Sequence, residues 1–181
     1  MSAFFEAYRE GTLRVLKQHK DWADKAMAQL QNDSDFFREL GPRSHSVAVT
    51  LKHVAGNLRS RWLNFLSSDG EKPDRDRDNE FIILPENTRA DLMRRWEEGW
   101  KIVLEEIGNL KAEDADKMVL IRSEPHSIPL AIQRSLAHTA YHVGQILYLC
   151  RLVKEGDWNW LTIAPGKSQD FNQNMKSQHG K

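Results

Sequence analysis

Four long segments with apolar residues at every third or fourth position constrain the fold of this 181-residue chain most strongly. That spacing places apolar side chains on one face of an α-helix, and the face must pack against another element. The segments cover residues 3–31, 44–67, 88–107 and 128–154. We therefore predict an all-α protein, a four-helix bundle with a crossover connection, because most of the connections are longer than minimal.

The ends of the segments carry helix-boundary signals. Ser44 and Thr88 are N-cap candidates for the second and third helices, and Pro129 suits the first turn of the fourth. Residues 111–126 are the least helical, with "KMVLIR" as a short β-like run and "SEPH" as a turn before the last long helix. We expect an exposed loop at residues 67–81, an irregular tail at 156–181 and one domain over residues 1–181.

Charge and composition limit the kinds of partner that this chain can bind. Lys plus Arg (26) equals Asp plus Glu (26), so no strong positive field attracts nucleic acid or an anionic membrane. No apolar run approaches the ~20 residues of a membrane span, and charges at Glu6 and Arg9 interrupt any secretory signal. The single cysteine, Cys150, lies in an apolar helical context typical of a core residue. We predict a cytoplasmic protein that binds neither nucleic acid nor membrane.

The stretch "LAHTAYHVGQILYL" places His138 and His142 four residues apart on the last long helix. Residues i and i+4 lie about 40° apart around a helix, so the two imidazoles point the same way and can share one ion. Imidazole nitrogen is a common ligand of zinc and also suits nickel, copper and iron. With seven histidines in the chain, chance alone gives such a pair in roughly one case in four.

A catalytic metal site generally has three protein ligands and an open position. His53, in "LKHVAGNLRSRW" on the second helix, is the candidate third ligand, and small residues share its face of the helix. Gln145 and Asn57 are candidate outer hydrogen-bond partners of these ligands. We expect the remaining histidines at the surface: His19, His45, His126 and His179.

Together, "LKHVAGNLRSRW" and "LAHTAYHVGQILYL" resemble the DinB-like (DinB/YfiT) superfamily of metalloenzymes over most of the chain. The stretches "DGEKPDRDRDNEF", "IRSEPHSI" and "WNWLTIAPGKSQDFN" look like an uncharacterised branch, a domain of unknown function. The resemblance implies a DinB-like helical bundle with a crossover, commonly dimeric. It also implies zinc or nickel bound by His53, His138 and His142, with water in the open positions.

Characterised DinB-like proteins include bacillithiol- and mycothiol-dependent transferases. The resemblance therefore implies a metal-dependent enzyme that activates a low-molecular-weight thiol and acts on a small-molecule substrate by S-transferase-like chemistry. Guanidinium groups bind carboxylates in a two-pronged geometry, and this gives four candidate contacts for the thiol or substrate. They are Arg59, Arg61, Arg75 and Arg77.

Two alternatives remain open from the sequence. A metal-dependent hydrolase needs a general base near the metal-bound water, and Glu124 in the "SEPH" turn is the candidate. A non-enzymatic, dimeric, stress-related bundle would use the metal as a structural clamp. Trp96 and Trp100 could line its interface or pack in the core, and their spacing favours the core. Four protein ligands would favour the structural role, and three with exchangeable water would favour catalysis.

Overall fold

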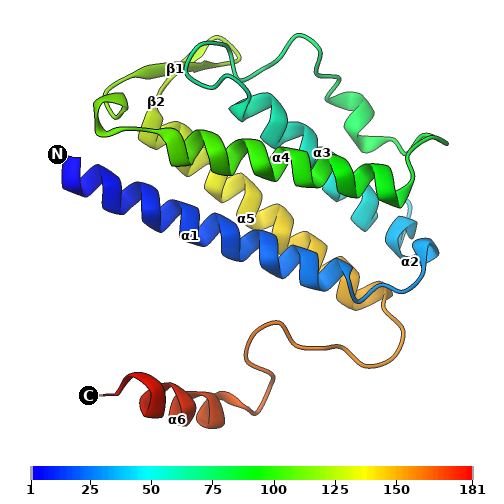
Figure 1. Cartoon of the computed structure of the whole chain (residues 1–181). Helices are drawn as coiled ribbons and strands as arrows, with labels where there is room; N and C mark the ends of the chain where they lie inside the picture. Colours follow the sequence, from blue (N-terminus) through cyan, green and yellow to red (C-terminus); the bar gives the residue numbers. More distant parts are fainter. Residues whose placement is uncertain (1, 181) are drawn as a thin grey trace.

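The computed structural model describes residues 2–180, in which four long helices form a bundle (Figure 1). α1 and α3 each pack against both α4 and α5. The predicted all-α bundle is therefore confirmed. The four helices are α1 (Ser2–Met27), α3 (Val47–Trp62), α4 (Arg89–Asn109) and α5 (Ile128–Val153).

The connection between α3 and α4 gives the bundle its crossover. The two helices run in the same direction, so the chain must return along the length of the bundle before α4 begins (Figure 1). Residues 63–88 make this connection and are called the return segment. This return contains a short 3₁₀ helix, η1 (Asp78–Phe81), and η1 contacts α3. A five-residue helix, α2 (Asp33–Phe37), lies between α1 and α3.

The bundle core buries three large indole side chains, Trp62, Trp96 and Trp100. Trp96 and Trp100 pack edge to face with ring centroids 5.4 Å apart, and Trp96 Nε1 donates a hydrogen bond to Asp24. Of the two placements open to Trp96 and Trp100, the favoured one in the core is therefore confirmed, because both side chains are fully buried within one chain. Cys150 is a core residue as predicted, and burial raises the pKa of its thiol to about 12.

The helix ends differ from the sequence prediction by a few residues. α1 ends at Met27 rather than residue 31. α3 begins at Val47 because Ser46, not Ser44, accepts the capping hydrogen bond from Val49 N, at 3.2 Å. It ends at Trp62 rather than residue 67, just before Asn64 adopts a positive φ of 53°. Thr88 caps α4 as predicted.

A β-hairpin follows α4 and a 3₁₀ turn, η2 (Ala112–Asp114). β1 (Met118–Ile121) pairs antiparallel with β2 (Glu124–Ser127), and Arg122 and Ser123 form the two-residue turn. Both turn residues have positive φ, 57° and 64°, which is the geometry that matches the twist of the paired strands. The β-like run is confirmed, whereas the "SEPH" turn is wrong because most of it forms β2.

The C-terminal tail contains α6 (Ser168–His179), so the prediction of an irregular tail is wrong over these residues. None of the residues of α6 is buried. Its two large apolar side chains, Phe171 and Met175, do not make the wide stripe that reveals a packed helix in a sequence. None of the helices within residues 2–180 combines the length and apolar composition that a membrane span requires.

Candidate metal centre

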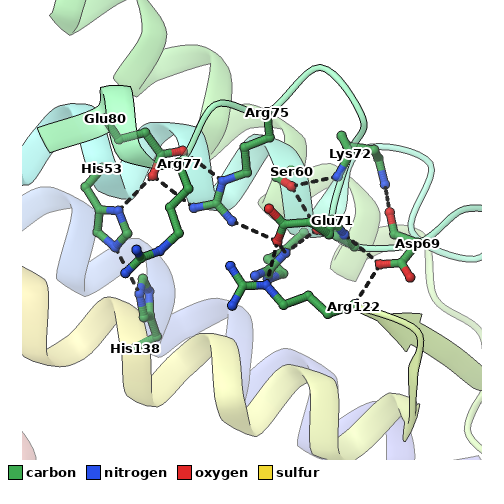
Figure 2. A network of polar contacts seen from close by, with 12 residues as sticks. His53, Ser60, Asp69, Glu71, Lys72, Arg75, Arg77, Glu80, Arg122 and His138 are labelled. Atoms are coloured by element: carbon green, nitrogen blue, oxygen red, sulfur yellow. Dashed lines mark hydrogen bonds and ion pairs between the residues drawn. The ribbon is translucent and has the colours of Figure 1, made fainter. Parts of the chain in front are cut away.

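Three histidines from two helices converge where α3 faces α5. His53 Nε2 lies 3.3 Å from His138 Nε2 (Figure 2). The candidate ligand nitrogens of His53, His138 and His142 all lie within 4.8 Å of one another. Two nitrogens bound at about 2.0–2.1 Å to one tetrahedral ion lie roughly 3.3 Å apart. The His53–His138 pair matches this spacing, and the three imidazoles could hold a single divalent ion.

The protonation state of the α5 histidines suits metal binding. The pKa of His138 is lowered to about 3, mainly by burial and to a smaller extent by the nearby His142 and His53. Burial also lowers the pKa of His142 to about 4, although a hydrogen bond with Gln145 opposes it. Both rings are neutral near pH 7, and neutral imidazole is the form that binds a metal. His142 Nε2 is buried and has no hydrogen-bond partner within residues 2–180, which leaves this nitrogen available to an ion.

A carboxylate orients His53 from the opposite side of its ring. Glu80 Oε2 lies 2.8 Å from His53 Nδ1, and both side chains are buried. This contact favours a proton on Nδ1 and directs the Nε2 lone pair toward His138, as carboxylates behind metal-binding histidines do. Burial raises the pKa of Glu80, but hydrogen bonds from His53 and Arg75 outweigh it and hold that pKa below its usual value.

Arg75, Phe81 and Gly56 surround the contact between Glu80 and His53. Arg75 grips both carboxylate oxygens, with Nε 2.8 Å from Oε1 and Nη2 2.9 Å from Oε2 (Figure 2). Phe81, the next residue, stacks on the His53 ring at 4.8 Å. A Cβ at Gly56 would lie 2.8 Å from the Glu80 carboxyl carbon, so the carboxylate approaches α3 only because this position is glycine.

The sequence prediction missed Glu80. Its segment, residues 67–81, is expected from the sequence to be an exposed loop, but Lys72 and Glu80 are buried. The high charge density of "DRDRDNEF" predicts exposure to solvent, although several of these charges form ion pairs with one another. The adjacent acidic and aromatic residues at Glu80 and Phe81 were the available signal of a segment that turns inward.

The two predicted outer partners behave differently. Gln145 Oε1 lies 2.8 Å from His142 Nδ1, so it meets a candidate ligand as expected. Asn57 is buried beside His53 in the pocket wall, but its side chain makes no hydrogen bond to a ligand within residues 2–180. His126 was expected at the surface and is only 1% exposed, because it lies in β2 with Arg134 Nη1 2.6 Å from its Nε2.

A pocket of about 270 Å³ opens beside His53 and His138. Tyr141 and the apolar side chains of Trp62, Phe65 and Ile121 form part of its wall. Five arginines line it, and none of its lining residues within residues 2–180 is acidic. Three of these were predicted, Arg61, Arg75 and Arg77, while Arg122 and Arg134 were not. Arg59 instead lines a separate cavity of about 470 Å³ and pairs with Asp74 at 2.8 Å.

A polar network fixes several of these arginines (Figure 2). Glu71 Oε2 lies 2.8 Å from Arg61 Nη1, 3.0 Å from Arg122 Nε and 3.4 Å from Arg75 Nη1. The Asp69 carboxylate accepts hydrogen bonds from the backbone N–H groups of Arg122 and Ser123, at 2.8 and 2.7 Å. The return segment and the β-hairpin are thereby joined at the edge of the pocket.

Glu124 lies away from the histidine cluster. Its side chain is exposed on β2, with Oε2 3.7 Å from Arg134 Nη1, and it is not among the residues that line the pocket. The structure therefore does not bring this candidate base to the candidate ligands. A base assigned from a turn before the ligand helix depended on the turn geometry, and Glu124 lies in a strand instead.

The family of the chain can be identified from its sequence. A family model described as "Protein of unknown function (DUF1572)" matches residues 4–167, a range that includes the three clustered histidines. No curated protein and no solved structure gives a match. Because the family model spans most of the 181 residues, the chain belongs to the DUF1572 family.

Proposed function

We propose that this protein is a metal-dependent enzyme with one divalent ion, zinc or nickel, on His53, His138 and His142. The proposed chemistry is the transfer or conjugation of a low-molecular-weight thiol, an S-transferase-like reaction on a small molecule. The observation that supports it best is a three-histidine cluster beside an arginine-lined pocket. Within residues 2–180 the cluster has three members, whereas closed structural zinc sites have four protein ligands.

The residues around the cluster have complementary roles in this proposal. A bound divalent ion lowers the pKa of a thiol or water and so supplies a nucleophile near neutral pH. Tyr141 lines the same pocket, and its ring centroid is 5.2 Å from that of His138. Burial raises the pKa of the Tyr141 phenol, so this group stays protonated and can donate a hydrogen bond to the substrate. The pocket arginines supply charge for anionic groups.

The same geometry gives less support to a hydrolase. Metal-assisted hydrolysis needs a general base within hydrogen-bonding reach of the attacking water. Both oxygens of Glu80 are engaged by His53 and Arg75, and Glu124 lies outside the pocket lining. We therefore favour transferase chemistry over hydrolysis. A homodimer and a cytoplasmic location are further parts of the proposal, and they rest on the resemblance and the composition alone.

Two measurements test the proposal one after the other: the metal content of the protein and its rate of thiol conjugation. Wild-type protein loaded with zinc or nickel should carry about one ion per chain by elemental analysis, and His142→Ala should lose most of it. The loaded wild type should then accelerate conjugation of bacillithiol or cysteine to an electrophile, and the metal-free protein should not. Equal metal content in the two proteins would overturn the site. A loaded protein without metal-dependent conjugation would overturn the transferase chemistry.

A further inference from the structure

The pocket beside the histidines carries an excess of positive charge. Five guanidinium groups line it, and the carboxylates that neutralise them approach from outside its wall. Glu71 is shared by three arginines, and Glu80 pairs with Arg75. Even with two looser contacts counted, at 3.7 Å from Glu124 and 3.9 Å from Asp78, positive charges outnumber negative ones. A divalent ion on the histidines would increase this excess of positive charge. Cations held close together repel one another, and an anion bound between them offsets the repulsion.

Arg77 is the least neutralised cation of the pocket. Its only ion pair within residues 2–180 is with Asp78, at 3.9 Å, and the Asp78 side chain is 98% exposed. The guanidinium carbon lies 5.1 Å from the centroid of the Phe81 ring, and Phe81 stacks on His53. Phe81 thereby positions Arg77 beside the candidate metal ligands. Figure 2 shows the guanidinium of Arg77 next to the imidazoles of His53 and His138.

Arg122 provides a second cation with free hydrogen-bond donors. Its Nε donates to Glu71, while neither terminal nitrogen has a hydrogen-bond partner within the described residues. The turn that carries it is fixed by the two backbone hydrogen bonds to Asp69. Two N–H groups of one guanidinium bind a carboxylate or a phosphate in a two-pronged manner. The position of Arg122 is thus set by the fold, and its binding surface is unused.

The remaining wall restricts the shape of a ligand. Trp62, Phe65 and Ile121 provide an apolar surface in the same pocket. A volume of about 270 Å³ is close to the lower end of small-molecule sites, which begin near ~300 Å³. It suits a small organic molecule and excludes a folded partner.

We propose that this pocket binds a small organic anion, with Arg77 and Arg122 holding its carboxylate or phosphate group. Its hydrocarbon part lies on the apolar wall of Trp62, Phe65 and Ile121. The inference rests on the proposed function only in placing the other end of the ligand at the histidines. It names the substrate class of that site: an acidic small molecule, not a neutral one.

Calorimetric titration of the full chain, with and without zinc, tests the proposal with defined probes. The acidic probes are mercaptosuccinate, succinate and phenyl phosphate, and the neutral probe is 2-mercaptoethanol. We expect mercaptosuccinate to bind zinc-loaded protein at least about tenfold more tightly than 2-mercaptoethanol. Tighter binding of succinate than of phenyl phosphate identifies a carboxylate ligand, and the reverse order identifies a phosphate. If none of the acidic probes binds, the proposal is overturned.

Three variants locate the site. Arg77→Met and Arg122→Met should each weaken binding of the acidic probes by about tenfold or more. The zinc content of both variants should stay close to that of the wild type. Arg77→Met should also keep the melting temperature, whereas Arg122→Met loses its hydrogen bond to Glu71 and should melt slightly lower. Arg59→Met removes the same charge from the neighbouring cavity and should bind like the wild type. Wild-type affinity in both Arg77→Met and Arg122→Met would contradict the proposal.

The two proposals can fail separately. Succinate or phenyl phosphate binding to metal-free protein, lost in Arg77→Met, would support the anion site even if no metal were bound. One zinc ion per chain, with acidic probes bound equally well by all the variants, would support the metal centre and overturn the anion site.

Discussion

At the scale of single residues, the candidate centre depends on how His53 is oriented. The sequence gives no direct indication of this orientation, because Glu80 lies 27 residues beyond His53 in the chain. The helical pair His138 and His142 follows from spacing alone, since i and i+4 share a face whatever surrounds the helix. His53 could be proposed from the resemblance, but its carboxylate partner depends on how the return segment folds. The candidate ligands and Gln145 could therefore be proposed from the sequence, whereas Glu80 could not.

Replacing the carboxylate should weaken the metal site without removing a ligand. In Glu80→Gln, the amide holds His53 less firmly. It also lacks the negative charge that makes the imidazole a stronger metal ligand. We expect metal affinity to fall about 10- to 100-fold, measured by competition with a chelator. Glu86→Gln is the matched control, because Glu86 is exposed in the wall of the neighbouring cavity. Unchanged affinity in a folded Glu80→Gln protein would show that this contact does not support the metal.

Gly56 offers a test of the same contact from the α3 side. Alanine normally stabilises a helix interior by about 1 kcal/mol relative to glycine. At Gly56 the added methyl group would occupy the space of the Glu80 carboxyl group, so we expect Gly56→Ala to lower both stability and metal affinity. Gly11→Ala is the control, because nothing lies within 4 Å of a Cβ there and the usual gain should appear in denaturant unfolding. A stabilised, fully metal-binding Gly56→Ala would refute the packing argument.

At the scale of elements, the helices were predictable and the return segment was not. Apolar periodicity identified all four long helices, because each buries one face over several turns. Residues 63–88 have no such period. Their inward contacts come from isolated positions such as Lys72, which donates to the Asp69 carbonyl oxygen, and Glu80. Arg122 was missed for the same reason, since its placement depends on the hairpin register and on the return segment. Arg134 lies one turn before His138 on α5, so helical spacing alone was enough to place it beside the candidate ligands.

The carboxylates of the return segment should make the free energy of unfolding depend on pH. Burial raises the pKa of Glu71, but hydrogen bonds from Arg61 and Arg122 outweigh it and lower the pKa below the unfolded value of 4.5. A depressed folded pKa contributes stability above the unfolded pKa, and this contribution is lost as the pH falls through the folded value. We expect the unfolding free energy to fall below about pH 4.5, measured by denaturant titration. Glu71→Gln should show a shallower fall, and an identical pH profile would contradict this assignment.

At the scale of the whole molecule, a metal bound between α3 and α5 should stabilise the bundle. An ion that binds only the folded chain at 100 times its dissociation constant adds about 2.7 kcal/mol to the unfolding free energy. For a chain of this size, that corresponds to a rise of roughly 5–10 °C in melting temperature. We expect this rise when zinc is added to metal-free wild type in calorimetry, and little rise in His142→Ala. An equal rise in both proteins would place the stabilising ion elsewhere.

The most direct test of the central claim is the position of the ion itself. Crystals of zinc-loaded protein, measured on both sides of the zinc absorption edge, should give one strong anomalous peak between the rings of His53, His138 and His142. The three imidazoles should be the only protein ligands, at about 2.0–2.1 Å, with the open position facing the arginine-lined pocket. A peak at other residues of a fully loaded protein, or a fourth protein ligand that closes the site, would contradict the account.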